Sequence, residues 1–325
     1  MMGTPAAHGR WRLISLGVGV ALFAAVLAGS DLKGVWELLS RFQWRFGMVF
    51  LFYIVIFGLD TLGWKFAMRP QVQSRIPWSR LFRVRLAGEA VNYVTPAASI
   101  GGEPVKAWIL SRRHGVPMEE GMASVVVAKT TFTLSMLIFA ALGLWVMLAT
   151  QPLSSKLMAW VWVVLPGLSG LTLLFVLVQF LQPFERGSRF LSRWMPVWFW
   201  KLSDRVRRWD EEIVSFYRQS PGSVFWSLGF HFLGWLAGAV EVYLILHFLN
   251  LPVSWATAFS LEALWVLLRS GAFLIPASLG ASEGFLLLIC GALGLGAIPG
   301  LALGLIRRAR EVAWTGLGLL EFSRG

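Results

Sequence analysis

The sequence predicts an all-α fold, namely a polytopic membrane helical bundle of about six spans and two re-entrant hairpins arranged as an inverted repeat. Three observations predict it. Of the 325 residues, 57% are hydrophobic and 14% are charged, whereas about 25% are charged in soluble domains. Apolar runs long enough to cross a bilayer recur along the chain, and one Pro-Ala motif occurs twice. Residues 1–325 are therefore expected to form a single transmembrane domain.

Six apolar stretches are expected to span the membrane, because a spanning helix needs about 20 such residues. The first follows Arg10 and Arg12 and resembles a secretory signal peptide, which is removed from a mature chain. We expect an uncleaved span instead, because the rest of the chain is hydrophobic and needs a first anchor. The six predicted spans are residues 13–29, 46–66, 125–149, 157–181, 222–249 and 298–320.

Two further apolar stretches, residues 86–104 and 254–296, are broken by proline and glycine. Lipid cannot satisfy the N–H and C=O groups that such breaks set free, so irregular backbone is tolerated only inside the protein or beside a polar cavity. Each stretch is therefore predicted to be a re-entrant hairpin of two half-helices. Full crossings by residues 254–275 and 284–296 remain the alternative.

Basic residues mark one side of the predicted bundle. Arg10 and Arg12 precede the first span, and basic runs at 65–85 and 186–208 follow the second and the fourth. Because cytoplasmic loops are enriched in Lys and Arg, the sequence predicts cytoplasmic termini and places the protein in the inner (plasma) membrane of the cell. The loops expected on the other side are nearly uncharged and comprise residues 150–156 and 250–255.

The cytoplasmic segment 182–221 interleaves tryptophans with basic residues, which is typical of a helix lying on the inner leaflet. The net charge of +12 is accordingly assigned to loops and to anionic lipid. No nucleic-acid partner is expected.

A short repeat relates the two halves of the chain. Pro-Ala, with a glutamate seven residues after the proline, occurs at 96–103 and again at 276–283, which is an offset of 180 residues. The same offset superposes the second predicted span on the fifth and the third on the sixth. Three spans is an odd number, so the half at about 157–325 is expected to cross the membrane upside down relative to the half at about 1–150.

Several ionisable residues fall inside the predicted membrane segments, where each costs roughly 2.5 to 3.5 kcal/mol on insertion scales. One set is predicted to contact an anionic lipid headgroup and consists of Glu103, Lys129, Glu283, Arg307, Arg308 and Arg310. The supporting intramembrane charges are Asp60, Glu241, Glu262, Arg269 and Glu311. Arg307 lies four residues before Glu311, so the two side chains can share a helix face. Glu262 and Arg269, seven residues apart, can do the same.

Structural roles remain open as alternatives for several of these charges. Lys129 would snorkel to the interface if residues 130–149 alone formed the span. The arginines at 307–310 would lie in a loop if residues 284–306 formed a span. The supporting charges would be structural pairs or satisfied core acids if they served only the fold.

Enzyme and metal motifs are weak. Residues 280–284 fit the Gly-x-Ser-x-Gly pattern of hydrolases, but that motif needs a preceding strand and a later histidine, and neither is expected here. His231 and His247 have no further ligands at metal-site spacing and are interpreted as packed helix residues. Cys290 is the single cysteine, so it has no disulfide partner. Neither a cofactor, a metal nor an enzyme activity is expected.

Several motifs resemble one family of membrane proteins. They are Gly-Gly-Glu-Pro-Val-Lys-Ala at 101–107, Ser-Arg-Arg-His-Gly-Val at 111–116, Ala-Ser-Val-Val-Val at 123–127, and Leu-Gly-Ala-Ser-Glu-Gly at 279–284 with residues 307–314. Through these motifs, residues 40–320 resemble the flippase-like family that includes the transmembrane region of lysylphosphatidylglycerol synthase. Ala-Lys-Thr-Thr at 128–131 resembles the branch associated with hopanoid biosynthesis, whereas many relatives have an acidic residue and an arginine at its first two positions.

The resemblance implies that the protein moves lipid headgroups between leaflets. We expect an integral membrane lipid translocase or lipid-transport protein that handles anionic headgroups and is linked to phospholipid or hopanoid metabolism, with one half rocking against the other. The alternative is a non-transporting accessory subunit that scaffolds lipid-biosynthesis enzymes, and a membrane-embedded lipid enzyme is the third candidate. A polar cavity joining the two hairpins would favour transport, and charges paired in a dry core would favour the scaffold. The aminoacyl-transferase domain of the synthase is not expected, so no synthase activity is implied.

Overall fold

The computed structural model describes residues 5–95, 101–150, 155–180, 211–272 and 275–324. Within these ranges every regular element is helical, as predicted, and no strand occurs. The long apolar runs become long helices because a helix satisfies its backbone groups within the segment, which lipid cannot do.

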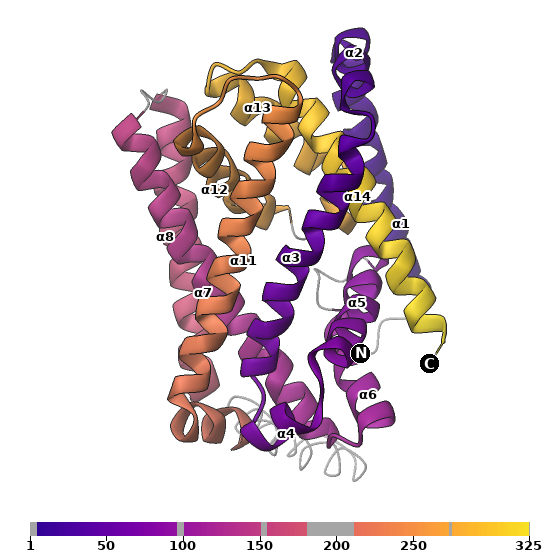
Figure 1. The fold of residues 1–325 in the computed structure, drawn as a ribbon, viewed down its shortest axis with the longest axis vertical. Helices are drawn as coiled ribbons and strands as arrows, with labels where there is room; N and C mark the ends of the chain where they lie inside the picture. Colours follow the sequence, from indigo (N-terminus) through magenta and orange to yellow (C-terminus); the bar gives the residue numbers. More distant parts are fainter. Residues whose placement is uncertain (1–4, 96–100, 151–154, 181–210, 273–274, 325) are drawn as a thin grey trace.

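The helices run mostly along the long axis of the molecule (Figure 1). In chain order they are α1 (Pro5–Ala28), α2 (Leu32–Phe42), α3 (Arg45–Phe66), α4 (Pro70–Arg75), α5 (Trp78–Val94), α6 (Gly102–His114), α7 (Met118–Thr150), α8 (Ser155–Phe180), α11 (Pro221–Phe248), α12 (Trp255–Gly271), the 3-10 turn η1 (Pro276–Ser278), α13 (Ala281–Ala292) and α14 (Ala297–Ser323). A further helical stretch at residues 211–219 precedes α11. In Figure 1, α2, α12 and α13 lie toward the upper end and α4 and α6 toward the lower end.

Three helices, α3, α7 and α11, are each long and apolar enough to cross a membrane. The pair Leu16–Ala28 and Leu32–Phe42, bent by 94°, adds a fourth candidate if it is counted as one span. α8 has 26 residues with Pro166 inside it. α14 has 27 residues but carries four charges within residues 307–311. By length and composition, the described residues therefore hold three to four candidate spans.

Each of the six stretches predicted to span the membrane coincides with the apolar part of one long helix, namely α1, α3, α7, α8, α11 or α14. Both stretches predicted as hairpins are interrupted, the first between α5 and α6 and the second between α12 and α13. The alternative of a loop at 307–310 is wrong, because α14 continues through these residues as a helix. Of the predicted interfacial segment, residues 182–210 lie outside the described residues.

Helices from the two halves of the chain pack against each other across the bundle. α3 lies against α11, α5 against α14, and α12 against α7, while α5 also packs on α6 and α12 on α13. Glycine permits two of these close approaches. A Cβ at Gly143 of α7 would lie 2.1 Å from the Cβ of Ala263 on α12. A Cβ at Gly318 of α14 would lie 2.4 Å from the carbonyl oxygen of Leu86 on α5.

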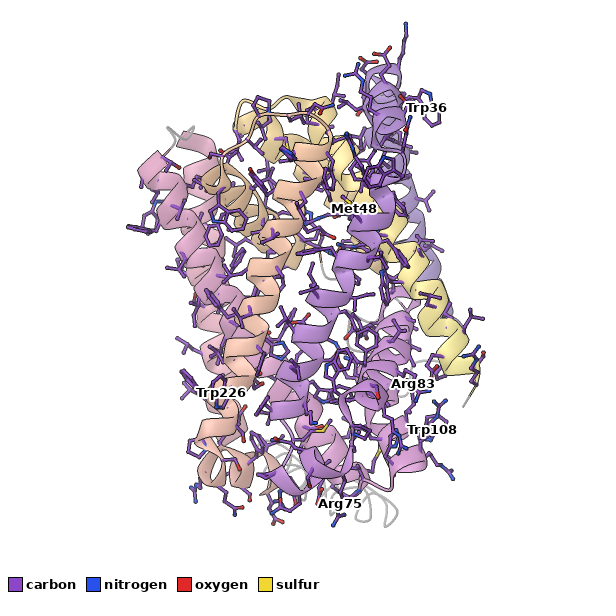
Figure 2. The ribbon with its side chains drawn as sticks, in the orientation of Figure 1. Trp36, Met48, Arg75, Arg83, Trp108 and Trp226 are labelled. Carbon is purple, nitrogen blue, oxygen red and sulfur yellow. The ribbon has the colours of Figure 1, made fainter. Side chains whose placement is uncertain are left out.

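Large apolar side chains cover much of the outer surface. Trp36, Trp145, Phe225 and Trp226 are each more than half exposed, and Figure 2 shows Trp36 and Trp226 on the periphery of the bundle. Water penalises so much exposed apolar area, whereas lipid accommodates it. The outside of the fold therefore suits a bilayer.

A close backbone contact marks one of the two interrupted helix pairs, and positive φ angles mark the other. A Cβ at Gly102 would lie 1.9 Å from the carbonyl oxygen of Gly88, so α5 and α6 meet closely at these two glycines. Between α12 and α13, the φ angles of Ala277, Ser278 and Gly280 are 53°, 48° and 75°. The left-handed region is unfavourable for residues other than glycine and persists where surrounding contacts hold it.

Candidate functional site

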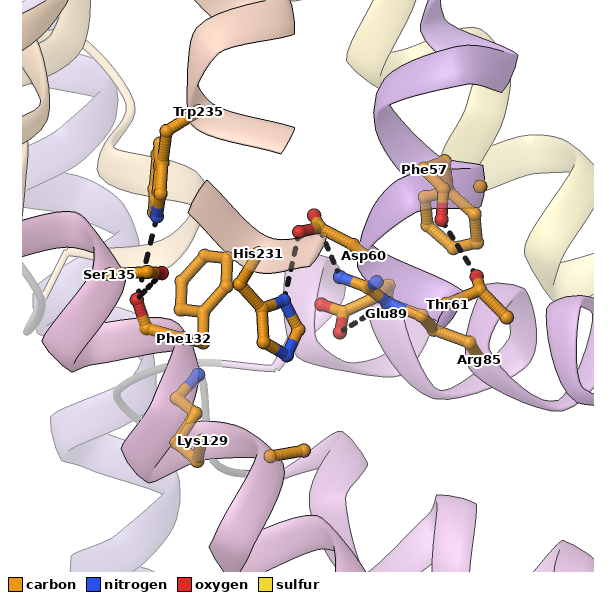
Figure 3. Close-up of polar contacts among 12 residues, drawn as sticks. Phe57, Asp60, Thr61, Arg85, Glu89, Lys129, Phe132, Ser135, His231 and Trp235 are labelled. Atoms are coloured by element: carbon orange, nitrogen blue, oxygen red, sulfur yellow. Dashed lines mark hydrogen bonds and ion pairs between the residues drawn. The ribbon is translucent and has the colours of Figure 1, made fainter. Parts of the chain in front are cut away.

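A network of ionisable side chains, the α5–α6 cluster, connects α3, α5, α6, α7 and α11. Acidic and basic groups alternate along it, and Figure 3 shows part of it. In order of contact its members are His231, Asp60, Arg85, Glu89, Lys106, Glu103 and Lys129.

Lys106 lies at the centre of the cluster. Its Nζ is 2.6 Å from Oε1 of Glu89 and 2.9 Å from Oε2 of Glu103. Nζ of Lys129 lies 3.6 Å from Oε1 of Glu103. Because buried charges are tolerated only with opposite charges beside them, these pairs hold α5, α6 and α7 in one arrangement.

Asp60 links the cluster to α11. Its Oδ2 accepts a hydrogen bond from Nη2 of Arg85 at 3.1 Å, and its Oδ1 lies 3.1 Å from Nδ1 of His231 (Figure 3). The His231 ring meets the ring of Phe132 edge-on, with 5.4 Å between centroids. On its other side the ring lies so close to α3 that a Cβ at Gly63 would come within 2.6 Å of it. The imidazole is therefore fixed in place.

Asn92 joins the end of α5 to the start of α6. Its Oδ1 accepts a hydrogen bond from the backbone N–H of Gly102 at 2.6 Å, and its Nδ2 donates to Oε1 of Glu103 at 3.3 Å. On α5, Arg85 and Glu89 are four residues apart and share a helix face. The four-residue spacing on α5 and the Asn92 amide together bring the charged side chains of α5 and α6 close to each other.

A cavity of about 90 Å³ lies beside the α5–α6 cluster. Its polar lining comprises Arg85, Glu89, Glu103, Lys106, Lys129 and His231, and its apolar lining includes Trp64 and Phe132. Two buried nitrogens of this lining, Nη1 of Arg85 and Nε2 of His231, have no hydrogen-bond partner among the described residues. The side chains of Glu89 and Lys129 are 36% and 41% exposed, so the cavity is open on that side. A buried polar group without a hydrogen-bond partner costs about 1–3 kcal/mol. A polar ligand that bonded to these nitrogens would therefore be favoured in this cavity.

A second network, the α14 cluster, connects α11, α12, α13 and α14. Its members are Glu241, Glu262, Arg269, Glu283, Arg307, Arg308, Arg310 and Glu311. Nη2 of Arg307 lies 2.8 Å from Oε2 of Glu262, and its Nε lies 3.3 Å from Oε2 of Glu241. Arg310 also pairs with Glu241. The side chains of Arg307 and Arg310 are only 4% and 6% exposed, so these arginines are buried against carboxylates.

The two residue pairs predicted to share a helix face are not ion pairs in this cluster. Glu262 does not pair with Arg269 but with Arg307 of the neighbouring helix. Arg269 in turn places Nη1 3.2 Å from Oε1 of Glu311. Residues seven apart are separated by about 10.5 Å along a helix axis, which is too far for a direct ion pair. The facing helices supply the nearer partners of both residues.

Arg308 connects the two interrupted helix pairs. Its Nη2 lies 2.7 Å from Oε1 of Glu283 at the start of α13. Its Nη1 donates to the hydroxyl of Tyr93, near the end of α5, at 2.8 Å, and to the carbonyl oxygen of Ala277 at 2.9 Å. The planar fork of a guanidinium suits such divided donation. Arg308 therefore contacts both the end of α5 and the turn that precedes α13.

The weak motifs take up structural roles. Ser282, the serine of the Gly-x-Ser-x-Gly pattern, follows a 3-10 turn rather than a strand, and its hydroxyl accepts a hydrogen bond from Nε1 of Trp265 at 3.1 Å. Cys290 is buried. Within the described ranges, no group of three or more His, Cys, Asp or Glu residues is arranged to hold a metal ion.

A second, larger pocket of about 500 Å³ lies on the surface near α4 and α6. Arg69, Arg75, His114 and Glu120 are among its lining residues. Burial lowers the pKa of His114, and neighbouring arginines act in the same direction. Arg69 is held by Glu212, with 2.5 Å between Nη2 and Oε2. The positive charge of this pocket therefore comes from its arginines, Arg69 and Arg75.

Comparison with known proteins identifies the family. The sequence matches the family described as the lysylphosphatidylglycerol synthase TM region over residues 12–318. The chain belongs to this family. It is also similar to a UPF0104 membrane protein of Methanothermobacter thermautotrophicus, with 25% identity over 258 residues that cover 74% of this chain and 73% of the relative. No solved structure matches the chain.

As a member of the lysylphosphatidylglycerol synthase TM-region family, the chain is an integral membrane protein, as predicted. The six residues predicted to contact a headgroup do not form one site. Glu103 and Lys129 line the cavity, whereas the other four belong to the α14 cluster and are absent from that lining: Glu283, Arg307, Arg308 and Arg310. The cavity thus reaches the α5–α6 pair but does not join it to Glu283.

Four further cavity residues were not among the predicted site residues, namely Arg85, Glu89, Lys106 and His231. Arg85 was assigned to the cytoplasmic basic run, yet its side chain is 11% exposed and bonded to Asp60. His231 is a packed helix residue, as predicted, but it also binds a carboxylate. A signal was available, because in this sequence a lysine and two glutamates flank a helix break and mark an unusual concentration of charge.

Proposed function

We propose that the protein is a lipid translocase of the inner (plasma) membrane, which moves an anionic lipid headgroup past the α5–α6 cluster. The charged cavity is the observation that carries this proposal. Its lining has buried nitrogens without partners, inside a protein whose outer surface is apolar. Intramembrane charges are expensive and mark functional sites. No catalytic activity is part of the proposal, and membrane lipids are the partners it requires.

An inverted repeat accounts for the helix packing. With the offset of 180 residues, α3 corresponds to α11, α5 to α12, α6 to α13 and α7 to α14. The contact of α5 with α14 then corresponds to that of α12 with α7, and α3 with α11 is the shared central contact. The pair of Glu103 with Lys129 corresponds to that of Glu283 with Arg308. We infer six spans and two re-entrant hairpins that enter from opposite sides.

The orientation follows from the basic side chains. Arg75 and Arg83 lie at the lower end of the molecule in Figure 2, where the surface pocket near α4 also lies. The positive-inside rule places this end in the cytoplasm, together with both termini. An anionic headgroup of the inner leaflet would meet the surface pocket first and the cavity next.

A scaffold for lipid-biosynthesis enzymes is the second candidate, and the α14 cluster favours it. Its central arginines are buried and paired with Glu241 and Glu262, as a purely structural network would be. The same network serves a translocase if it fixes one repeat while the other moves. Arg308, which contacts both helix interruptions, would then transmit the movement.

Lipid exchange in reconstituted liposomes tests the proposal. Fluorescent lipids with anionic and with zwitterionic headgroups would be compared for the parent, for Glu103→Gln and for the exposed control Glu37→Gln. We expect the parent and the control to exchange anionic lipid faster than protein-free liposomes. Glu103→Gln should be slower by about tenfold or more, since a hydrogen bond to a charged group contributes about 1.5–3 kcal/mol. Exchange at the protein-free rate for every lipid would refute translocation and leave the scaffold.

A further inference from the structure

The charges of the α5–α6 cluster balance except at one group. Three carboxylates oppose three basic side chains: Asp60, Glu89 and Glu103 against Arg85, Lys106 and Lys129. His231 is the remaining member. The cluster is therefore neutral when the imidazole is neutral and carries one positive charge when the imidazole is protonated.

The His231 ring is arranged to accept a proton. Its Nδ1 lies 3.1 Å from the Asp60 carboxylate, which fixes that nitrogen as the N–H donor of the neutral ring. Its Nε2 has no hydrogen-bond partner in the described parts of the chain, and the ring lines the cavity. Nε2 is buried close to Gly63 of α3, and a proton that reaches it would bind without breaking a hydrogen bond. Unperturbed imidazole changes charge between about pH 5 and 8.

Protonation of His231 changes the charges that surround the Asp60 carboxylate. The carboxylate then lies between two cations, because Arg85 is already 3.1 Å from its other oxygen. Nη1 of Arg85 has no partner among the described residues, so the guanidinium can turn its free edge to an anion in the cavity. One added positive charge matches one phosphodiester headgroup.

The charged groups that face His231 in the described structure all belong to this cluster. They are Asp60 from α3, Arg85 and Glu89 from α5, Glu103 and Lys106 from α6, and Lys129 from α7. α12 and α14 also pack on α11, but their charges meet it farther along, where Arg307 lies 3.4 Å from the carbonyl oxygen of Gly238. The bases of the α14 cluster are arginines, which keep their protons in proteins. Of the two clusters, only the α5–α6 cluster contains an imidazole.

We propose that the protein binds one proton together with one anionic headgroup, with Nε2 of His231 as the proton acceptor and Arg85 and Lys129 as contacts of the headgroup phosphate. This inference rests on the proposed function and names the ion coupled to it. The proton arrives from the water of the cavity and returns to water when the headgroup leaves. A proton gradient would then drive the lipid, because the two ligands favour each other's binding by the same factor.

Binding measurements at several pH values test this coupling. Short-chain phosphatidylglycerol, an anionic probe, and phosphatidylcholine of the same chain length would be titrated into the full chain in detergent between about pH 5 and 8. We expect the Kd for phosphatidylglycerol to fall toward acid by up to about tenfold per pH unit, as one linked proton requires. The Kd for phosphatidylcholine should stay constant.

Three variants separate the proton site from the fold. His231→Gln should show a pH-independent Kd, at the weak level that the parent has in alkali. Asp60→Asn supplies the extra positive charge without a proton, so its Kd in alkali should already be at the tight level that the parent reaches only in acid. His247→Gln, an exposed histidine on the same helix, should match the parent.

Three outcomes would overturn the inference. Proton coupling would be refuted if His231→Gln and the parent showed the same pH dependence, or if the Kd of the parent were constant. The translocase proposal would still stand if lipid exchange persisted. If phosphatidylglycerol did not bind at any pH and lipid exchange stayed at the protein-free rate, both proton coupling and the translocase proposal would be refuted. If His231→Gln does not fold, the tight Kd expected of Asp60→Asn in alkali still decides the matter.

Discussion

Neutralising Glu241 should destabilise the fold more than any single surface change. Its side chain is 2% exposed and lies between Arg307 and Arg310, which are themselves 4% and 6% exposed. In Glu241→Gln the two arginines retain one carboxylate, Glu262, which contacts Arg307 alone. Arg310 would then have no direct ion pair within the described structure, and its guanidinium would stay over the Tyr53 ring, 4.1 Å from the centroid. One buried guanidinium would thus be left without an ion pair.

Breaking a buried ion pair by removing one partner costs about 3–5 kcal/mol. With an unfolding entropy of about 2.1 cal/mol/K per residue, this loss lowers the Tm of a chain of this length by about 4–7 °C. Thermal unfolding in a mild detergent, followed by the fluorescence of the 18 tryptophans, measures the shift. The double variant Glu241→Gln with Arg310→Met should recover part of it, because the unpaired charge is then removed as well.

The exposed Glu37 on α2 provides the matched control, since Glu37→Gln changes the same chemistry outside the buried network. We expect its Tm to stay within about 1 °C of the parent, as for most surface substitutions. Equal Tm shifts for Glu241→Gln and Glu37→Gln would refute the conclusion that the α14 cluster is a structural network.

Three further predictions follow from close contacts. Gly102→Ala places a Cβ 1.9 Å from the carbonyl oxygen of Gly88, so its Tm should fall by an amount that corresponds to about 1–3 kcal/mol. The control Gly222→Ala meets no neighbour within 4 Å and should keep the Tm of the parent. Equal Tm values for the two variants would argue against the close approach of α5 and α6. Arg308→Lys keeps the charge but cannot contact both interrupted helix pairs at once. The Tm of this variant should therefore fall, and its lipid exchange should be slower. Parent-like values of both would exclude a linking role for Arg308. Cys290 is fully buried, so a maleimide should label it only after unfolding, and rapid labelling of the folded protein would contradict its placement.

The helices were predictable where a single physical rule determines them. A long apolar run must become a helix in lipid, and α3, which begins at Arg45 and ends at Phe66, follows the predicted stretch almost residue for residue. The short helix α2 was missed because its 11 residues mix apolar and charged positions. Its start carried a usable signal, since the Asp31 side chain accepts a hydrogen bond from the N–H of Gly34 and so caps the helix.

The candidate site was predictable only in part, because sequence spacing describes one helix at a time. Glu103 and Lys129 were identified by the cost of burying charge, and both line the cavity. Arg85 was counted with the basic loop because it ends a run of basic residues, and its carboxylate partner lies 25 positions away on another helix. The partner of Arg269 was likewise on a neighbouring helix. Such contacts depend on how helices pack, which no spacing within a helix encodes.

Photochemical mapping of the headgroup would show whether a lipid occupies the cavity between α5, α6 and α7. A phospholipid with a diazirine on its headgroup would be reconstituted with the parent protein, irradiated, and its adducts located by mass spectrometry. We expect adducts on cavity residues, namely Glu89, Lys106 or Lys129. Adducts confined to outward-facing residues such as Trp145 and Phe225 would mean that the headgroup stays outside the bundle and that the cavity is not its path.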